Sequence, residues 1–274
     1  MQLGIFAKTF SALGAAPVLN AVHDTGFDCA QFNMACVGLA SMPEEIAPKQ
    51  AEDIAAASKA SGVSISAVSG TYNMAHPDIR VRADGLRRLG VIIANAKALG
   101  TNLVTLCTGT RDVDDQWRWH KNNATPEAWR DLTIEMEKAL KIAEAHGIYL
   151  GIEPELGNIV SSAPAAKRLL DEMKSPHLRV VLDPANLFEV ASEQKRHAII
   201  DEAVDLLGGS IVMAHAKDRD AKGAFVAAGK GVIDFRHFVN SLKQAGFNGP
   251  LVTHGLTEAE APSVAAFLKS VIVA

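Results

Sequence analysis

The chain has 274 residues, of which 48% are hydrophobic and 21% are charged, and its formal net charge is −4 at pH 7. This length and apolar content suffice for one large core, and the slightly acidic balance argues against a broad nucleic-acid-binding surface. No apolar run approaches the roughly 20 residues of a membrane span, and the first residues do not read as a signal peptide. The three cysteines, Cys29, Cys36 and Cys107, lack metal-type spacing and fit a reducing compartment. We therefore expect a cytoplasmic protein that does not contact membranes.

Strand-like and helix-like segments alternate along the whole chain. Short apolar runs predict strands at residues 3–7, 29–34, 63–69, 103–107, 148–153, 178–183, 210–215 and 250–254. Helical spacing of apolar residues, often closed by a glycine, predicts helices at residues 43–61, 79–99, 126–146, 163–173, 193–207, 234–245 and 258–273. The repeating unit is therefore one strand followed by one helix.

About eight such units, each about 30 residues long, favour an α/β fold in the form of a closed (β/α)8 TIM barrel. We expect a single domain over residues 1–274, because no linker or low-complexity stretch interrupts the alternation. A doubly wound open sheet is the alternative, but its glycine-rich phosphate-binding motif is absent after the first strand. In a barrel, catalytic groups lie at the C-terminal ends of the strands.

Four successive apolar runs end on residues that can bind a divalent cation or move a proton, namely Glu153, Asp183, His215 and His254. Parallel neighbouring strands would bring all four side chains to one rim of the barrel. Each residue also has an ordinary structural interpretation. Glu153 can form a salt bridge, Asp183 can cap a helix, and either histidine can be a packing residue. An acidic or imidazole residue at four strand ends out of four favours a site.

The chain resembles the sugar phosphate isomerase/epimerase superfamily of xylose-isomerase-like barrels over nearly its full length. The resemblance rests on five motifs, which are GIEPE (151–155), VVLDPANLF (180–188), HAKDRD (215–220), GKGVIDF (229–235) and NGPLVTHG (248–255). That family includes ketose 3-epimerases, hydroxypyruvate isomerase, inosose dehydratase and, more distantly, an abasic-site endonuclease. The resemblance implies a barrel enzyme that acts on a small carbohydrate.

The resemblance also implies a site for one divalent cation. The family usually binds it through Glu, Asp, His and Glu on strands five to eight, which match Glu153, Asp183 and His215, with His254 in place of the last Glu. In the epimerases the two glutamates are also the opposed bases, so Glu153 and His254 become the candidate catalytic pair. Two imidazoles favour Mn²⁺, Co²⁺ or Zn²⁺ over Mg²⁺, and we expect Mn²⁺.

Four residues near these motifs are candidates for substrate binding. Glu155 faces the same side as Glu153 by the two-residue strand period, although it can also be a loop charge. Asn186 stands where relatives place a substrate-binding His or Asn. Lys217 and Arg219 can hold hydroxyls, a carboxylate or a phosphate, although Arg219 can also belong to a solvated loop.

The loops after the third and fourth predicted strands are rich in recognition-type residues. They carry His76, Arg111, Trp117 and His120. Indole faces suit the CH faces of sugars, and a guanidinium suits anionic or hydroxylated groups. We expect these four side chains to lie over the mouth of the site, with a subunit interface as the alternative.

The function that follows is a divalent-metal-dependent isomerase or epimerase of a keto-sugar or sugar derivative. The alternative is a lyase on the same fold, either an inosose-type dehydratase or a 3-keto-glycoside-cleaving enzyme, as part of a complex or alone. A nucleic-acid repair enzyme and a catalytically silent barrel subunit are further alternatives. The expected partners are a small carbohydrate and further copies of the chain, with a hetero-complex left open and neither nucleic acid nor membrane involved.

Overall fold

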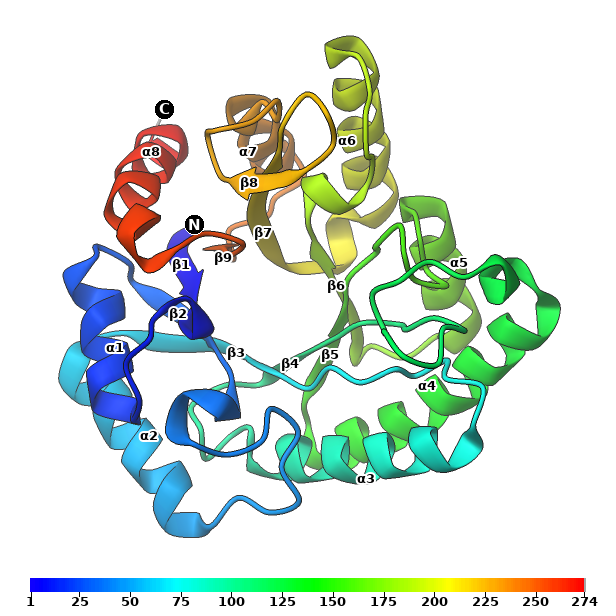
Figure 1. Ribbon diagram of the computed structural model, residues 1–274, viewed down its shortest axis with the longest axis horizontal. Coiled ribbons are helices and arrows are strands. Elements are labelled where there is room, and N and C mark those ends of the chain that lie inside the picture. Colours follow the sequence, from blue (N-terminus) through cyan, green and yellow to red (C-terminus); the bar gives the residue numbers. More distant parts are fainter. Residues whose placement is uncertain (274) are drawn as a thin grey trace.

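The computed structural model describes residues 1–273, which form a closed barrel of eight parallel strands surrounded by helices (Figure 1). The barrel strands are β1 (Gln2–Phe6), β2 (Cys29–Phe32), β3 (Ser64–Ser69), β4 (Leu103–Leu106), β5 (Tyr149–Ile152), β6 (Leu178–Leu182), β7 (Ile211–Arg219) and β9 (Pro250–Thr253). Each strand pairs with the next one in this order, and β9 pairs with β1 to close the barrel. The predicted (β/α)8 TIM barrel is confirmed.

The helices form the outer ring of the barrel. They are α1 (Ala15–Asp24), α2 (Pro48–Ser61), α3 (Ile79–Asn95), α4 (Pro126–His146), α5 (Ala163–Met173), α6 (Glu193–Leu207), α7 (Phe235–Gln244) and α8 (Ala261–Val273). Their apolar faces pack on the strands, as when Leu132, Met136 and Leu140 of α4 are buried toward the barrel. Within the described part of the chain, no helix is long and apolar enough to cross a membrane.

Four elements differ from the sequence prediction, and the first of them, α3, ends at Asn95, four residues earlier than predicted. Helix α1 was not predicted, because Pro17 stands in its short apolar pattern, yet that residue falls in the first turn, where proline is tolerated. Helix α2 begins at Pro48, five residues later than predicted, with proline again in its first turn. The short strand β8 (Phe225–Ala227) pairs antiparallel with the end of β7, which therefore runs past His215 to Arg219.

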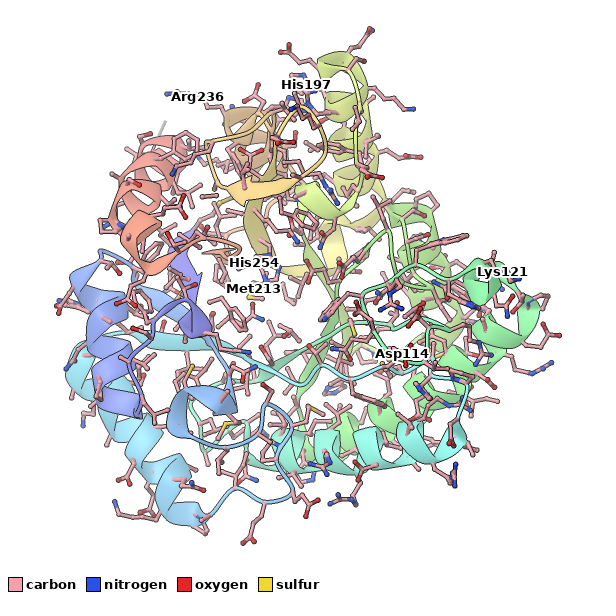
Figure 2. All side chains as sticks on the ribbon, in the orientation of Figure 1. Asp114, Lys121, His197, Met213, Arg236 and His254 are labelled. Carbon is pink, nitrogen blue, oxygen red and sulfur yellow. The ribbon has the colours of Figure 1, made fainter. Side chains whose placement is uncertain are left out.

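The barrel interior is filled by side chains, and close packing dictates some residue choices. A Cβ atom on Gly151 in β5 would lie 2.8 Å from Val181 Cγ2, so only glycine fits at that point. Val181, Met213 and Val252 form a buried apolar cluster inside the barrel. In Figure 2, which looks down the barrel, Met213 and His254 both lie near its centre.

Candidate metal and catalytic site

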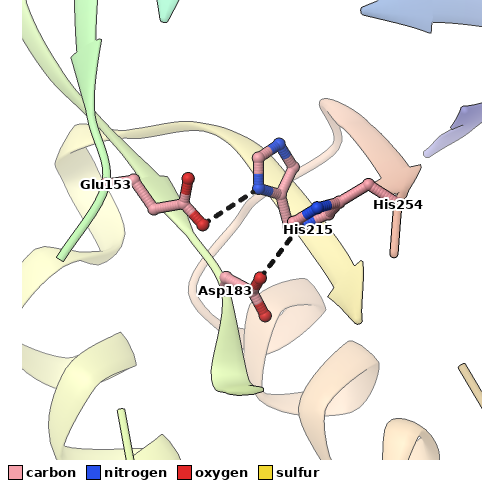
Figure 3. Close-up of side chains that lie close together, drawn as sticks. All are labelled: Glu153, Asp183, His215 and His254. Carbon is pink, nitrogen blue, oxygen red and sulfur yellow. Dashed lines mark hydrogen bonds and ion pairs between the residues drawn. The ribbon is translucent and has the colours of Figure 1, made fainter. Parts of the chain in front are cut away.

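Four side chains from four neighbouring strands converge at the C-terminal rim (Figure 3). Glu153 directly follows β5, Asp183 follows β6, His215 lies within β7, and His254 follows β9. Their ligand atoms all lie within 4.8 Å of one another. Parallel strands that each end on such a residue therefore deliver one compact cluster.

Each carboxylate in this cluster pairs with one imidazole. His215 Nδ1 lies 3.1 Å from Glu153 Oε1, and His254 Nε2 lies 3.0 Å from Asp183 Oδ2. The two imidazole rings are tilted against each other, with centroids 4.5 Å apart. Carboxylates and imidazoles therefore stand in pairs in the cluster, and each partner lowers the free-energy cost of burying the charge of the other.

Neighbouring polar groups hold the two carboxylates in place. Asn186 donates from Nδ2 to Glu153 Oε1 at 2.7 Å, and the ammonium of Lys217 donates to Asn186 Oδ1 at 2.8 Å. Lys217 Nζ also lies 3.4 Å from Asp183 Oδ2, and the Ala185 amide donates to Asp183 Oδ1 at 2.9 Å. Asp183 is fully buried, so these contacts replace the water it has lost.

Burial and charge act against each other on the ionisable groups. Burial alone would raise the pKa of Asp183, but Lys217 and then the hydrogen bond from His254 hold this pKa well below its usual range. Burial would also raise the pKa of Glu153, but His215 outweighs it, and the pKa is lowered. For His215, burial disfavours the charged form, yet the adjacent Glu153 carboxylate leaves its pKa raised. Both carboxylates are therefore ionised at neutral pH.

Two further groups at the site have shifted pKa values. Burial and then the nearby imidazole of His215 lower the pKa of His254, so it is mainly neutral at pH 7. Burial and then the charge of Glu153 raise the pKa of Glu155 to about 7. A neutral imidazole is the form that binds a metal ion.

The donor set fits a divalent cation. Ligand atoms that share an ion at 2.0–2.3 Å lie within about 4.6 Å of each other, close to the separation in this cluster. Two carboxylates and two imidazoles suit a borderline first-row metal rather than Ca²⁺, which takes six to eight oxygen ligands. The four residues can therefore hold one metal ion after small movements of the side chains.

A cavity of about 400 Å³ opens above this cluster. Of the residues predicted from the sequence, it is lined by Trp117, Glu153, Glu155, Asn186, His215, Lys217 and His254. Phe6, Lys8, Gln31, Asn33, Thr71, Thr105 and Gln116 are further lining residues that the sequence did not single out. The volume is large enough for one monosaccharide-sized molecule.

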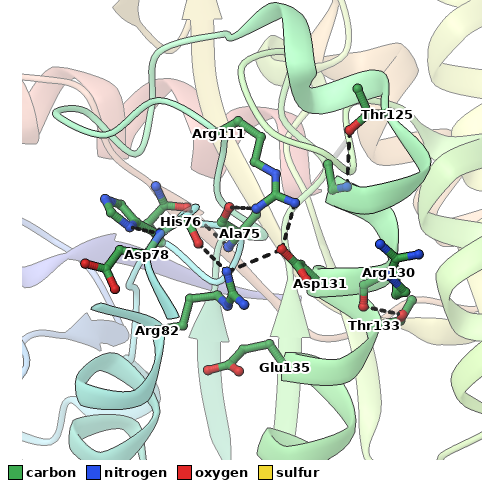
Figure 4. Close-up of polar contacts among 12 residues, drawn as sticks. Ala75, His76, Asp78, Arg82, Arg111, Thr125, Arg130, Asp131, Thr133 and Glu135 are labelled. Atoms are coloured by element: carbon green, nitrogen blue, oxygen red, sulfur yellow. Dashed lines mark hydrogen bonds and ion pairs between the residues drawn. The ribbon is translucent and has the colours of Figure 1, made fainter. Parts of the chain in front are cut away.

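Four other predicted substrate residues, His76, Arg111, His120 and Arg219, lie outside the cavity lining. Arg111 is buried instead in an ion network, where its Nη2 lies 2.7 Å from Asp131 Oδ2 (Figure 4). Arg82 shares the same carboxylate at 3.4 Å, so α3, α4 and the loop after β4 are joined. In this structure the Arg111 guanidinium is thus paired with a carboxylate away from the cavity lining, as a largely buried guanidinium requires.

The remaining three side chains also stabilise local structure. His76 Nε2 lies 3.3 Å from the Val113 carbonyl, and His120 Nδ1 accepts a hydrogen bond from the Asn122 amide. Arg219 donates from Nε to the Ala185 carbonyl at 2.6 Å. The contacts of His76 and Arg219 join separate segments of the rim, whereas that of His120 lies within its own loop.

Two buried asparagines position the loop that carries Trp117. Asn158 accepts from the Gly109 amide at 2.8 Å and donates to the Gln116 carbonyl at 3.2 Å. Asn123 donates to the Gly157 carbonyl at 2.9 Å. Asn123 belongs to the recognition-rich loop seen in the sequence, whereas Asn158 could not be singled out, because its partners come from separate loops. Trp117 is therefore presented to the cavity by an anchored loop, although 46% of its surface is exposed.

A (β/α)8 barrel with a possible metal cluster at its C-terminal rim has the layout of TIM-barrel enzymes, whose active sites lie at that rim. The chain belongs to the xylose isomerase-like TIM barrel family, whose sequence pattern matches residues 19–271. None of the curated proteins is significantly similar to this chain in sequence.

Solved structures with the same fold include several sugar epimerases. The E. coli 3-keto-D-glucoside 4-epimerase superposes with a TM-score of 0.78 at 15% identity, covering 98% of this chain and 99% of that one. A D-tagatose 3-epimerase-like protein also gives 0.78 at 17% identity, covering 100% and 97%. The D-psicose 3-epimerase of Clostridium cellulolyticum gives 0.74 at 17% identity, covering 99% of each chain. At these identities the likeness shows a shared fold.

Proposed function

We propose that the protein is a divalent-metal-dependent isomerase or epimerase of a keto-sugar or sugar derivative. The observation that carries this proposal is the cluster of Glu153, Asp183, His215 and His254 beneath a cavity of monosaccharide size. The structural relatives that are sugar epimerases support the same class of substrate. All four side chains are the proposed ligands, and Mn²⁺ is the expected ion.

Glu153 is the proposed base that removes a proton from the carbon beside the substrate carbonyl. Its Oε1 atom is occupied by Asn186 and His215, whereas within residues 1–273 its Oε2 atom accepts no hydrogen bond. The free oxygen can therefore approach a substrate carbon, while the bound one fixes the side chain. When bound, the divalent ion supplies Lewis-acid stabilisation of the negative charge that develops on the substrate oxygen.

His254 is the proposed second acid–base group as well as a ligand. It directly follows β9, and its pKa is lowered by burial and by His215. A neutral imidazole has one lone pair and one N–H, so a ring that holds the ion through one nitrogen can donate the proton on its other nitrogen to the substrate and later take it back. Trp117, Glu155, Asn186 and Lys217 are the proposed substrate contacts, because each lines the cavity.

The direct test measures proton abstraction without assuming the product. Protein freed of metal by chelation and reloaded with Mn²⁺ is incubated in D₂O with D-psicose, D-tagatose, D-fructose and methyl 3-keto-D-glucoside. We expect deuterium to enter one substrate at the carbon beside the carbonyl, and we expect the chelated protein and Glu153→Gln to lose this exchange.

Product analysis then separates the two reaction classes on this fold. An isomerase or epimerase conserves the mass of the substrate apart from deuterium, whereas a lyase releases water or an aglycone. Exchange that survives in Glu153→Gln would reject Glu153 as the base. Purified protein that binds no divalent ion on titration would reject the metal-dependent function as a whole.

A further inference from the structure

The carboxamide of Gln31 in β2 contacts the outer edge of His215. Gln31 Oε1 lies 2.8 Å from His215 Nε2, on the opposite side of the imidazole from Glu153. The amide nitrogen of Gln31 lies 3.2 Å from both Ser69 Oγ and Thr105 Oγ1. All four of these residues are buried. The ring of His215 is therefore contacted from β2, and the contacting amide is held in turn by β3 and β4. None of these three strands supplies a residue of the cluster.

The orientation of this amide decides which imidazole nitrogen is free. A neutral imidazole carries one proton, and only the nitrogen without it can bind a metal ion. The amide NH₂ group of Gln31 donates to the hydroxyls of Ser69 and Thr105, and the amide oxygen faces His215. An oxygen at that place accepts the proton of Nε2. In the metal-free protein Nδ1 carries a second proton, which it donates to Glu153 Oε1, and release of that proton leaves the lone pair of Nδ1 facing the cluster.

We propose that Gln31 is a positioning residue that fixes His215 with its proton on Nε2 and thereby sets the affinity of the cluster for a divalent ion. The inference rests on the metal site proposed above. Partners that hold the other nitrogen of a metal-binding histidine generally change metal affinity by about 10- to 100-fold. Gln31 is neutral, so it orients the ring without adding a charge to the site.

The experiment compares three variants that are titrated with Mn²⁺ by calorimetry after metal removal. Gln31→Met keeps the length of the side chain and removes the acceptor, so affinity should fall about 10- to 100-fold. Gln31→Glu restores an acceptor for the Nε2 proton, so affinity should return to the wild-type value or exceed it. Gln116→Met is the matched control, because Gln116 lines the same cavity and its side chain is not part of the cluster.

A general loss of packing would give a different pattern from a specific effect on His215. If Gln31 only fills space, both Gln31 variants should lower the melting temperature and the metal affinity together. Gln31→Glu should then be the more damaging of the two, because it buries a carboxylate. If Gln31→Met does not fold, Thr105→Val removes one anchor of the amide, and it should weaken Mn²⁺ binding by a few-fold.

Two results would overturn the inference while leaving the metal site intact. One is an Mn²⁺ affinity of Gln31→Met that stays within twofold of wild type. If Gln31→Met does not fold, the same affinity in folded Thr105→Val has this meaning. The other is an equal loss in Gln116→Met. Wild-type protein that binds no Mn²⁺ would instead reject the proposed function, and the role of Gln31 would fall with it.

Discussion

Replacing His254 by glutamate tests its proposed role as a ligand, because glutamate is the residue that the resemblance to xylose-isomerase-like barrels leads us to expect at this place. The change adds one negative charge at a place where Nε2 of the present side chain lies 3.0 Å from Asp183 Oδ2. Without metal, the new carboxylate faces Asp183 at close range, so we expect the metal-free variant to be less stable than wild type. With metal, the same charge is attracted by the ion.

The size of both effects follows from the geometry. Two like unit charges about 4 Å apart repel by about 4 kcal/mol when the effective dielectric constant is about 20. With a divalent ion in the site, the interaction of the new carboxylate becomes attractive, and the charge it meets is doubled. The loss of the bond from the imidazole to the ion, and of the solvation of the carboxylate, cancels much of this attraction. We expect a net tightening of about 1.4 to 2.8 kcal/mol, which is about ten- to hundredfold in the dissociation constant for Mn²⁺.

Calorimetric titration with Mn²⁺ and thermal unfolding with and without the ion measure both quantities. His254→Ala removes the ligand and should weaken binding at least tenfold, whereas His237→Ala is a matched control on α7. His237 also pairs with an aspartate, Asp201, at 2.7 Å, but lies outside the metal cluster. Unchanged Mn²⁺ affinity in His254→Ala, together with a less stable His254→Glu in the presence of Mn²⁺, would refute the ligand assignment.

Three further predictions follow from the same structure. Glu153 raises the pKa of His215 against the effect of burial, so the imidazole keeps its proton to higher pH than usual. The Mn²⁺ affinity should therefore fall as pH drops through this pKa, and a pH-independent affinity would contradict this. Trp117→Ala should raise KM for the substrate at least severalfold while the more exposed Trp119→Ala does not, and equal effects in steady-state kinetics would place Trp117 outside the site. Asp131→Ala should destabilise the fold by on the order of 3 kcal/mol in urea unfolding, because the guanidiniums of Arg82 and Arg111 lose their shared carboxylate. An unchanged urea midpoint would show that this ion network is dispensable.

The barrel and the cluster could be predicted from the sequence because both follow from local patterns. Fully buried strands such as β6 appear as apolar runs, and the run length locates the residue at which the chain reaches the rim. Asp183 and His254 were found in this way without any knowledge of their neighbours. The strand period also placed Glu155 on the same side as Glu153, and both line the cavity.

Arg111 and Gln31 show why the rest of the site could not be predicted. The partner of Arg111 is Asp131 on α4, and the packing of helices brings these two side chains together. Gln31 lies 184 residues from His215 along the chain, and only closure of the barrel makes them neighbours. A single polar residue in the otherwise apolar strand CAQF was the only available signal, and it points to no particular partner.

The placement of charge indicates what a neutral His254 contributes to the proposed metal site. Glu153 and Asp183 supply two negative charges, which a divalent ion would balance, and Lys217 adds one positive charge 3.4 Å from Asp183. A second glutamate in place of His254 would cancel that positive charge. With histidine and the neutral Gln31 instead, these groups and the ion would together keep a net positive charge, which the partly ionised Glu155 reduces but does not cancel. Such a site favours a reaction in which negative charge develops on the substrate oxygen, because the stabilisation is greater in the transition state than in the ground state.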